Sequence, residues 1–277
     1  MLPWSVGGCN QPFRLKMFFG YAMINCYDEK GGLRMRHQDI DTLRGVALFS
    51  MIGYHACWDF VYLLGADWPW YRSFGAYVWQ QSICWTFILL SGYCFFLGRR
   101  PVRRGLVTFS AGAIVSAVTY VVLPEAPIFC GVLTFLGLAT LISAPLKKAL
   151  RCIPPHLGLG VSFALFMLFR DVNEGFLGFE GLHIAALPRG TSLLTAVLGF
   201  PPPGFTSSDY FPLLPWLFLF WTGVFLSRLR PEREDLILRP VPVVTAMGRR
   251  SLLVYMAHQP VLYALLPLFD RLIGVFA

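Results

Sequence analysis

The chain has 277 residues, of which 56% are hydrophobic and only 14% are charged. A soluble domain carries about 25% charged residues, so this composition excludes an ordinary soluble protein and is typical of a membrane protein. The net charge of +8 follows from basic residues placed between apolar segments, and it gives no reason to expect a nucleic-acid partner.

The first 35 residues differ from the rest and are interpreted as an N-terminal extension with no assigned function. Their apolar stretch, Met17 to Cys26, is too short for a secretory signal. Residues 36–277 are predicted to form a single transmembrane domain, an all-α polytopic helical bundle with about seven spans. The fifth span is short and a weaker stretch lies at 191–200, so six or eight crossings stay as alternatives. The predicted spans are 42–63, 76–97, 104–123, 128–146, 155–169, 211–227 and 251–273.

Basic residues are distributed unequally between the two sides of these spans. If the first span is entered from the cytoplasm, the inner segments contain fifteen Arg and Lys residues and the outer segments four. This asymmetry predicts a cytoplasmic N-terminus and a C-terminus outside. The inner set is Arg36, Arg44, Arg99, Arg100, Arg103, Arg104, Lys147, Lys148, Arg151, Arg228, Arg230, Arg233, Arg239, Arg249 and Arg250, and the outer set is Arg72, Arg170, Arg189 and Arg271.

The first span carries two ionisable residues, Arg44 and His55, on one face. Eleven helical residues bring His55 back to within ~20° of Arg44, about 16 Å further along. Asp59 is a same-face neighbour of His55. Ionisable groups within a span are costly, so we interpret His55 as functional, with a structural hydrogen bond as the alternative. For Arg44, a ligand-binding role and an interfacial ion pair with Asp41 are equally good interpretations.

The turn after the second span contains Arg99, Arg100, Arg103 and Arg104. Topology alone explains such a cluster on the inner side. The alternative is that these guanidinium groups hold the phosphates of a donor molecule.

The outer connection between spans five and six is the longest, about 40 residues, and a connection of this length is commonly functional. Ser207-Ser208-Asp209 followed by Pro212 predicts a helix N-cap, with Asp209 and Tyr210 as alternative contacts for an acceptor. Other polar residues of this connection are interpreted as solvated: Glu174, Glu180 and His183.

His258 and Gln259 precede Pro260 inside the last span, where they either pack the bundle or line a cavity.

The seven cysteines show no CxxC pairing, so they predict neither a metal site nor disulfides. Motifs of metalloproteases, P-loop enzymes, dinucleotide-binding enzymes and serine hydrolases are absent from the sequence.

Four segments, in order over roughly residues 36–270, resemble the membrane acyltransferases related to heparan-α-glucosaminide N-acetyltransferase, whose bacterial branch was formerly called DUF1624. The Arg-x10-His spacing of Arg44 and His55, and the Arg-x-x-Arg of Arg100 and Arg103, also resemble the acyltransferase-3 proteins. The four segments are Asp39 to Leu48, Phe129 to Leu138, Asp209 to Trp216 and Gly248 to Pro260.

The resemblance implies transfer of an acetyl group from cytoplasmic acetyl-CoA to a hydroxyl or amine of an extracytoplasmic glycan. The lysosomal enzymes place their catalytic histidine in the loop after the first span, but Phe60 to Tyr77 contains no histidine. The role therefore passes to His55 as general base, with Asp59 fixing its tautomer.

Arg44 is expected near the donor's pantetheine or phosphates, and Arg100, Arg103 and Arg104 near its nucleotide end. No permanently bound cofactor or metal is expected. The expected partners are membrane lipid, acetyl-CoA and the glycan, and a homo-oligomer is an open expectation. The alternative functions are a small-molecule transporter or exporter that uses the same His and Arg as a relay, and a non-catalytic membrane scaffold.

Overall fold

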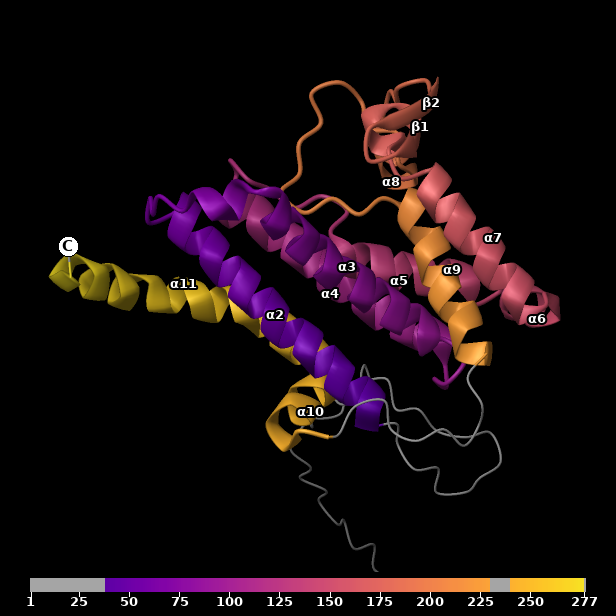
Figure 1. Cartoon of the computed structure of the whole chain (residues 1–277), viewed down its shortest axis with the longest axis horizontal. Helices are drawn as coiled ribbons and strands as arrows, with labels where there is room; N and C mark the ends of the chain where they lie inside the picture. Colours follow the sequence, from indigo (N-terminus) through magenta and orange to yellow (C-terminus); the bar gives the residue numbers. More distant parts are fainter. Residues whose placement is uncertain (1–37, 230–239, 277) are drawn as a thin grey trace, which may run out of the picture.

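The structure, a computed structural model, describes residues 38–229 and 240–276, and the predicted N-terminal extension lies outside them. The described chain is almost entirely helical (Figure 1). Its helices are α2 (Gln38–Tyr62), α3 (Phe74–Tyr93), α4 (Pro101–Val122), α5 (Val132–Ser143), α6 (Lys147–Cys152), α7 (Pro155–Leu168), α8 (Leu193–Leu198), α9 (Leu213–Leu229), α10 (Pro242–Arg249) and α11 (Ser251–Phe276), with short 3-10 turns at Pro69–Arg72 and Val172–Glu174.

Each of the seven predicted spans coincides with a helix, namely α2, α3, α4, α5, α7, α9 and α11. Two of them, α4 and the first 18 residues of α11, have both the length and the apolar composition of a membrane span. Only 17% and 6% of these two stretches is buried, so they are not core helices of a soluble fold. The chain is therefore a helical membrane protein.

The count of seven crossings stays a prediction, because α5, α7 and α9 have 12, 14 and 17 residues. At 1.5 Å per residue, helices of this size are about 18–26 Å long, which is less than the ~30 Å hydrocarbon core.

The outer connection contains the only strands of the described residues. β1 (Phe176–Phe179) and β2 (Leu182–Ala186) pair antiparallel, with an irregular register between Leu177 and Gly178. They form a small hairpin beyond the end of α7, next to α8 (Figure 1). The all-α prediction thus describes the bundle correctly but misses this hairpin.

Glycines allow the helices to approach closely. Where α3 crosses α9, a Cβ added at Gly92 would overlap the carbonyl of Phe220, and one at Gly223 would overlap the carbonyl of Leu89. Where α4 meets α5, Gly112 lies against the backbone of Thr134 in the same way. Small residues at crossings are typical of helices that associate in lipid, where backbone contact replaces the hydrophobic effect.

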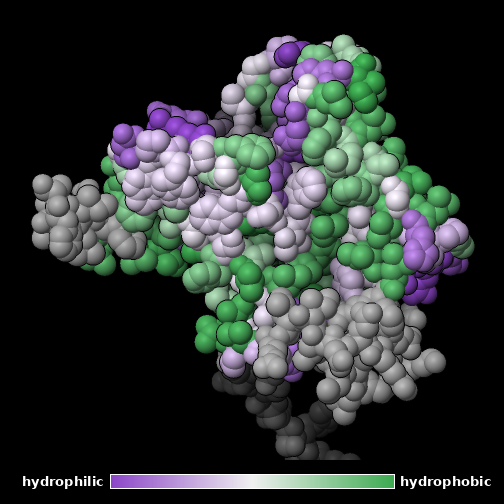
Figure 2. All heavy atoms as spheres, viewed as in Figure 1, coloured by the Kyte–Doolittle hydropathy of each residue, from purple (hydrophilic) through white to green (hydrophobic). Residues whose placement is uncertain are grey.

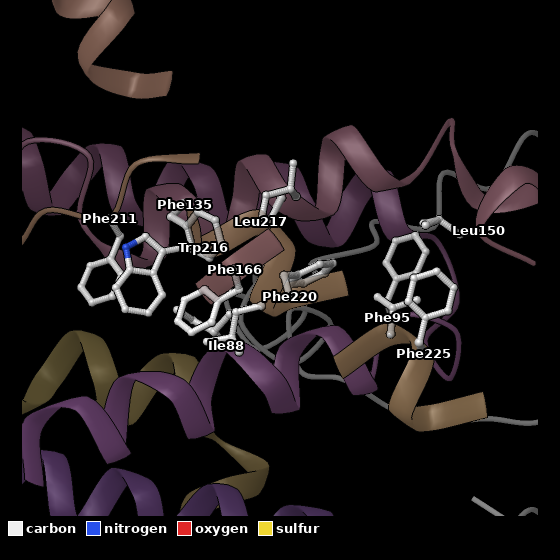
Figure 3. Packing of buried hydrophobic residues seen from close by; sticks show 13 residues of the cluster. Ile88, Phe95, Phe135, Leu150, Phe166, Phe211, Trp216, Leu217, Phe220 and Phe225 are labelled. Atoms are coloured by element: carbon white, nitrogen blue, oxygen red, sulfur yellow. The ribbon is translucent and has the colours of Figure 1, made fainter. Parts of the chain in front are cut away.

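The largest buried cluster lies among α3, α5, α7 and α9, and it is mostly aromatic (Figure 3). Phe166 is at its centre, in contact edge-to-face with Trp85 at a ring-centroid distance of 4.8 Å. This cluster fixes α3, and α3 in turn supports α2.

The space-filling view shows apolar residues over much of the visible surface, with polar groups concentrated towards its edges (Figure 2). Exposed apolar side chains are expected on a protein whose surroundings are lipid. The helix α2 packs against α3, α10 and α11, and α11 crosses α2 before it extends away from the bundle (Figure 1).

Candidate functional site

Two histidines meet where α2 and α11 cross. The rings of His55 on α2 and His258 on α11 lie 5.0 Å apart between centroids, and their planes are inclined by 55°. Both side chains are half-buried. Both residues are candidates from the sequence, but their contact is not predictable, since they are 203 positions apart.

The two imidazoles differ in their surroundings. The Nδ1 atom of His258 is hydrogen-bonded to the backbone carbonyl of Tyr255 on the same helix. Its Nε2 atom is buried and has no hydrogen-bond partner. Among the described residues the nitrogens of His55 have no hydrogen-bond partner either, but neither of them is fully buried. Nε2 of His258 is therefore enclosed by protein, whereas the His55 side chain is only partly buried.

Asp59 lies one turn after His55 and is only 1% exposed. Its Oδ1 atom accepts a hydrogen bond from Nε2 of Gln259, at 3.0 Å, which is a second polar link between α2 and α11. Its Oδ2 atom and Oε1 of Gln259 are buried without partners. The expected contact between Asp59 and His55 is not formed among the described residues, because the carboxylate bonds to Gln259 instead.

Aromatic residues enclose the α2 side of this site. Tyr54 packs against Trp79 of α3 and against Tyr71, with ring centroids 5.2 and 5.1 Å away. The Tyr71 hydroxyl donates to the carbonyl of Tyr54, and Trp79 Nε1 donates to Ser50 Oγ. These contacts hold the C-terminal half of α2 in a fixed orientation.

Arg44 is buried at the opposite end of α2, with 5% exposure. Its NH1 atom bonds to Asp41 Oδ1 at 3.1 Å and to the carbonyl of Gly248 at 3.5 Å, and NH2 bonds to Cys94 Sγ at 3.2 Å. The ion pair with Asp41 that the sequence offers as an interpretation is thus present. The Arg44–Asp41 pair is buried where α2, α10 and the end of α3 meet, and it does not extend towards the membrane surface as the snorkelling interpretation expects.

The arginine cluster lies at the same end of the bundle as Arg44. NH1 of Arg104 donates to the carbonyl of Cys94 at 3.3 Å, so Arg104 and Arg44 approach the same residue from two directions. Arg100 and Arg103 are exposed at the start of α4, where Arg100 has a left-handed backbone (φ 54°). The guanidinium groups of Arg44 and Arg104 therefore meet at Cys94, the residue that ends α3.

The predicted N-cap at Ser207-Ser208-Asp209 is wrong, because these side chains bond to the segment before α5 instead. Ser207 Oγ accepts from the Phe129 amide, and Ser208 Oγ donates to the carbonyl of Ala126. Asp209 Oδ2 accepts from the amide of Val132, the first residue of α5, at 3.0 Å. Asp209 thus caps a helix that precedes it by 77 positions.

Asp209 and Tyr210 have separate surroundings. Burial raises the pKa of Asp209 to about 6, although the Val132 amide opposes this shift. Its carboxylate lines a small cavity with Tyr255, whose ring centroid is 5.3 Å from that of His258. The hydroxyl of Tyr210 donates to the carbonyl of Ala196 in α8. Asp209 therefore shares a cavity with Tyr255, a ring neighbour of His258, whereas the Tyr210 hydroxyl bonds to α8.

A second polar cluster, beside the hairpin, was not predicted from the sequence. Glu180, interpreted as solvated, forms an ion pair with Arg170 at 3.1 Å and accepts from the Tyr77 hydroxyl. Arg170 also bonds to Gln81 and lies over the ring of Trp216. Tyr77 is 93 positions from Arg170 and 103 positions from Glu180, and no sequence signal connects residues so far apart. This cluster attaches the hairpin to α3 and α9.

Asp171, before the hairpin, and His183, on β2, contact different parts of the hairpin. The Asp171 carboxylate accepts from the amides of Glu180 and Gly181, and His183 stacks on Phe176 with centroids 3.8 Å apart. His183 is therefore packed rather than only solvated. Among the described residues, no three His, Cys, Asp or Glu side chains are grouped as a metal site.

The helical bundle with its long, apolar, little-buried helices is that of a membrane protein, and sequence comparison gives its family. Residues 36–260 match the family described as heparan-alpha-glucosaminide N-acetyltransferase, catalytic. The chain belongs to this family, and the expected resemblance is confirmed. The family description gives the class of activity as acetyl transfer. Searches of curated proteins and of solved structures found no match.

Proposed function

We propose that this protein transfers an acetyl group from cytoplasmic acetyl-CoA to a hydroxyl or amine of an extracytoplasmic glycan. The observation that carries the proposal is the partly buried imidazole of His55, held beside His258 between α2 and α11. A neutral imidazole is suited to accept a proton near pH 7, which is what an attacking hydroxyl or amine requires.

In the proposed reaction, His55 takes the proton from the acceptor's O–H or N–H group. The freed electron pair attacks the thioester carbonyl, a C–O or C–N bond forms, and the C–S bond breaks. The sulfur of CoA leaves as a thiolate and takes up a proton as the imidazolium returns to its neutral form. The atoms and charges balance without any further reactant, and no cofactor beyond acetyl-CoA is needed.

The donor is proposed to enter from the side that carries the arginine cluster. Arg100 and Arg103 are exposed there and suit the phosphates of CoA, while Arg104 and Arg44 are fixed behind them by Cys94. In this arrangement the side of α10 is cytoplasmic, the hairpin is outside, and the protein lies in a bacterial inner membrane. Asp59 holds Gln259 and so keeps α11 against α2.

The test is consumption of acetyl-CoA by the purified full-length protein in proteoliposomes, followed by chromatography of acetyl-CoA and CoA. Glucosamine and glucose serve as amine and hydroxyl probes for the acceptor. Consumption that depends on one of these sugars, with an acetylated sugar as product, supports the proposal. Transport of a sugar without formation of CoA would support the rival interpretation of a transporter.

A further inference from the structure

The orientation of His258 is fixed by the group that it contacts. A backbone carbonyl only accepts hydrogen bonds, so the Nδ1 atom that bonds to the carbonyl of Tyr255 must carry the proton. In the neutral imidazole the other nitrogen is then a bare acceptor. The Nε2 atom of His258 therefore carries a lone pair that can accept a hydrogen bond. This atom is buried, and no donor is bonded to it among the described residues.

A buried acceptor without a donor costs about 1–3 kcal/mol, so a donor within reach is expected to satisfy it. The ring in contact is that of His55, with centroids 5.0 Å apart. An N–H···N bond of about 3 Å, with each nitrogen about 1.1 Å from its ring centre, separates two imidazole centroids by roughly 5 Å. The observed spacing is compatible with a hydrogen-bonded imidazole pair, although the present ring orientations do not form the bond, and a rotation of the His55 ring is needed to align it.

We infer that His258 is the positioning residue of the reaction: its Nε2 atom accepts a hydrogen bond from one nitrogen of His55. This inference rests on the proposed function for its catalytic meaning. The bond leaves the other nitrogen of His55 unprotonated and directed to the hydroxyl or amine substrate. When His55 takes the acceptor's proton, the resulting imidazolium donates to His258, so the positive charge is not left without a partner.

In this arrangement His258 fixes the tautomer of His55, which is the role predicted from the sequence for Asp59. The carboxylate of Asp59 bonds to Gln259, the residue directly after His258, and so holds this part of α11 in place. A chain of contacts results, from the Tyr255 carbonyl through His258 to His55. Because Nε2 of His258 is sealed from outside, substrate touches His55 and not His258.

The first test is spectroscopic and needs no activity. The full-length protein is labelled with 15N-histidine, and long-range proton–nitrogen correlation reports the tautomer of each ring. We expect His258 with its proton on Nδ1, and His55 in a single tautomer that becomes a mixture in His258→Phe. The exposed His156 serves for the control variant His156→Gln, which should leave both signals unchanged. A proton on Nε2 of His258, or an unaltered His55 tautomer in folded His258→Phe, would overturn the inference.

The second test compares two replacements of similar polarity. The amide of His258→Gln reaches the place of Nε2, whereas that of His258→Asn reaches only the place of Nδ1. We expect His258→Asn to lower kcat by roughly 10- to 100-fold at unchanged KM for the acceptor, the range found when groups that orient metal-bound histidines are removed. His258→Gln should recover most of that loss.

Equal loss in both variants, or a rise in KM for the acceptor, would place His258 in direct contact with substrate and contradict the inference. Absence of turnover in the wild-type protein would contradict the proposed function instead, and the tautomer measurement would still decide the role of His258.

Discussion

Replacing Asp59 with alanine is expected to weaken the contact between α2 and α11. The side chain is 1% exposed and accepts a 3.0 Å hydrogen bond from Gln259, whose other amide atom has no partner. Hydrogen bonds between membrane helices contribute about 0.6 kcal/mol on average and up to about 1.7 kcal/mol. Because the amide donor would be left buried and unpaired, we expect a loss near the upper value, about 1–2 kcal/mol.

The assay is thermal unfolding in detergent, followed by tryptophan fluorescence, for the wild type, Asp59→Ala, Gln259→Ala and the double variant. The double variant should be more stable than the sum of the single losses predicts, with a coupling energy of about 1 kcal/mol. Asp67→Ala removes an exposed carboxylate from the neighbouring loop and should change stability by less than about 0.5 kcal/mol. Strictly additive losses at Asp59 and Gln259 would refute the reasoning.

Three further predictions concern the donor, the topology and pH. Arg100→Gln and Arg103→Gln should each raise KM for acetyl-CoA with kcat nearly unchanged. Lys148 is also exposed, and Lys148→Gln should leave KM for acetyl-CoA unchanged. A fall in kcat alone in the arginine variants would contradict donor binding. A phosphatase fused after Ala277 should be active outside the cytoplasm, and activity of a cytoplasmic reporter there instead would mean that a span is miscounted. Because burial raises the folded-state pKa of Asp209 from 3.8 to about 6, this group favours folding at low pH and its contribution is lost as pH rises through that range. Thermal unfolding from pH 4 to 7 should show this decline in the wild type and not in Asp209→Asn; equal slopes would refute it.

Helix positions were predictable from the sequence because long apolar runs in a membrane protein have few alternatives to helix. The seven predicted runs all coincide with helices. The shared face of Arg44 and His55 was also predictable, since helical geometry alone determines it. The length of α5 was not, because the predicted span 128–146 extends beyond both ends of the helix Val132–Ser143, whereas α7 and α9 are within one residue of the lengths of their predicted spans.

Contacts between distant segments were beyond prediction. Nothing in the local sequence of α2 indicates that His55 meets His258, or that Asp59 bonds to Gln259 rather than to its helical neighbour. The wrong cap at Asp209 has the same cause. A Ser-Ser-Asp sequence before a helix satisfies the local rule, but the tertiary fold brings the amide of Val132 closer.

The most direct test of the account compares acetyl transfer by the wild type and by His55→Ala. Both proteins are purified in full length, checked for a monodisperse folded state, and titrated with CoA before turnover is measured. The account predicts unchanged CoA binding and a loss of transfer of at least ~10²-fold, the usual size of a general-base contribution. Near-normal turnover in folded His55→Ala protein would contradict the assignment of His55 and, with it, the proposed site between α2 and α11.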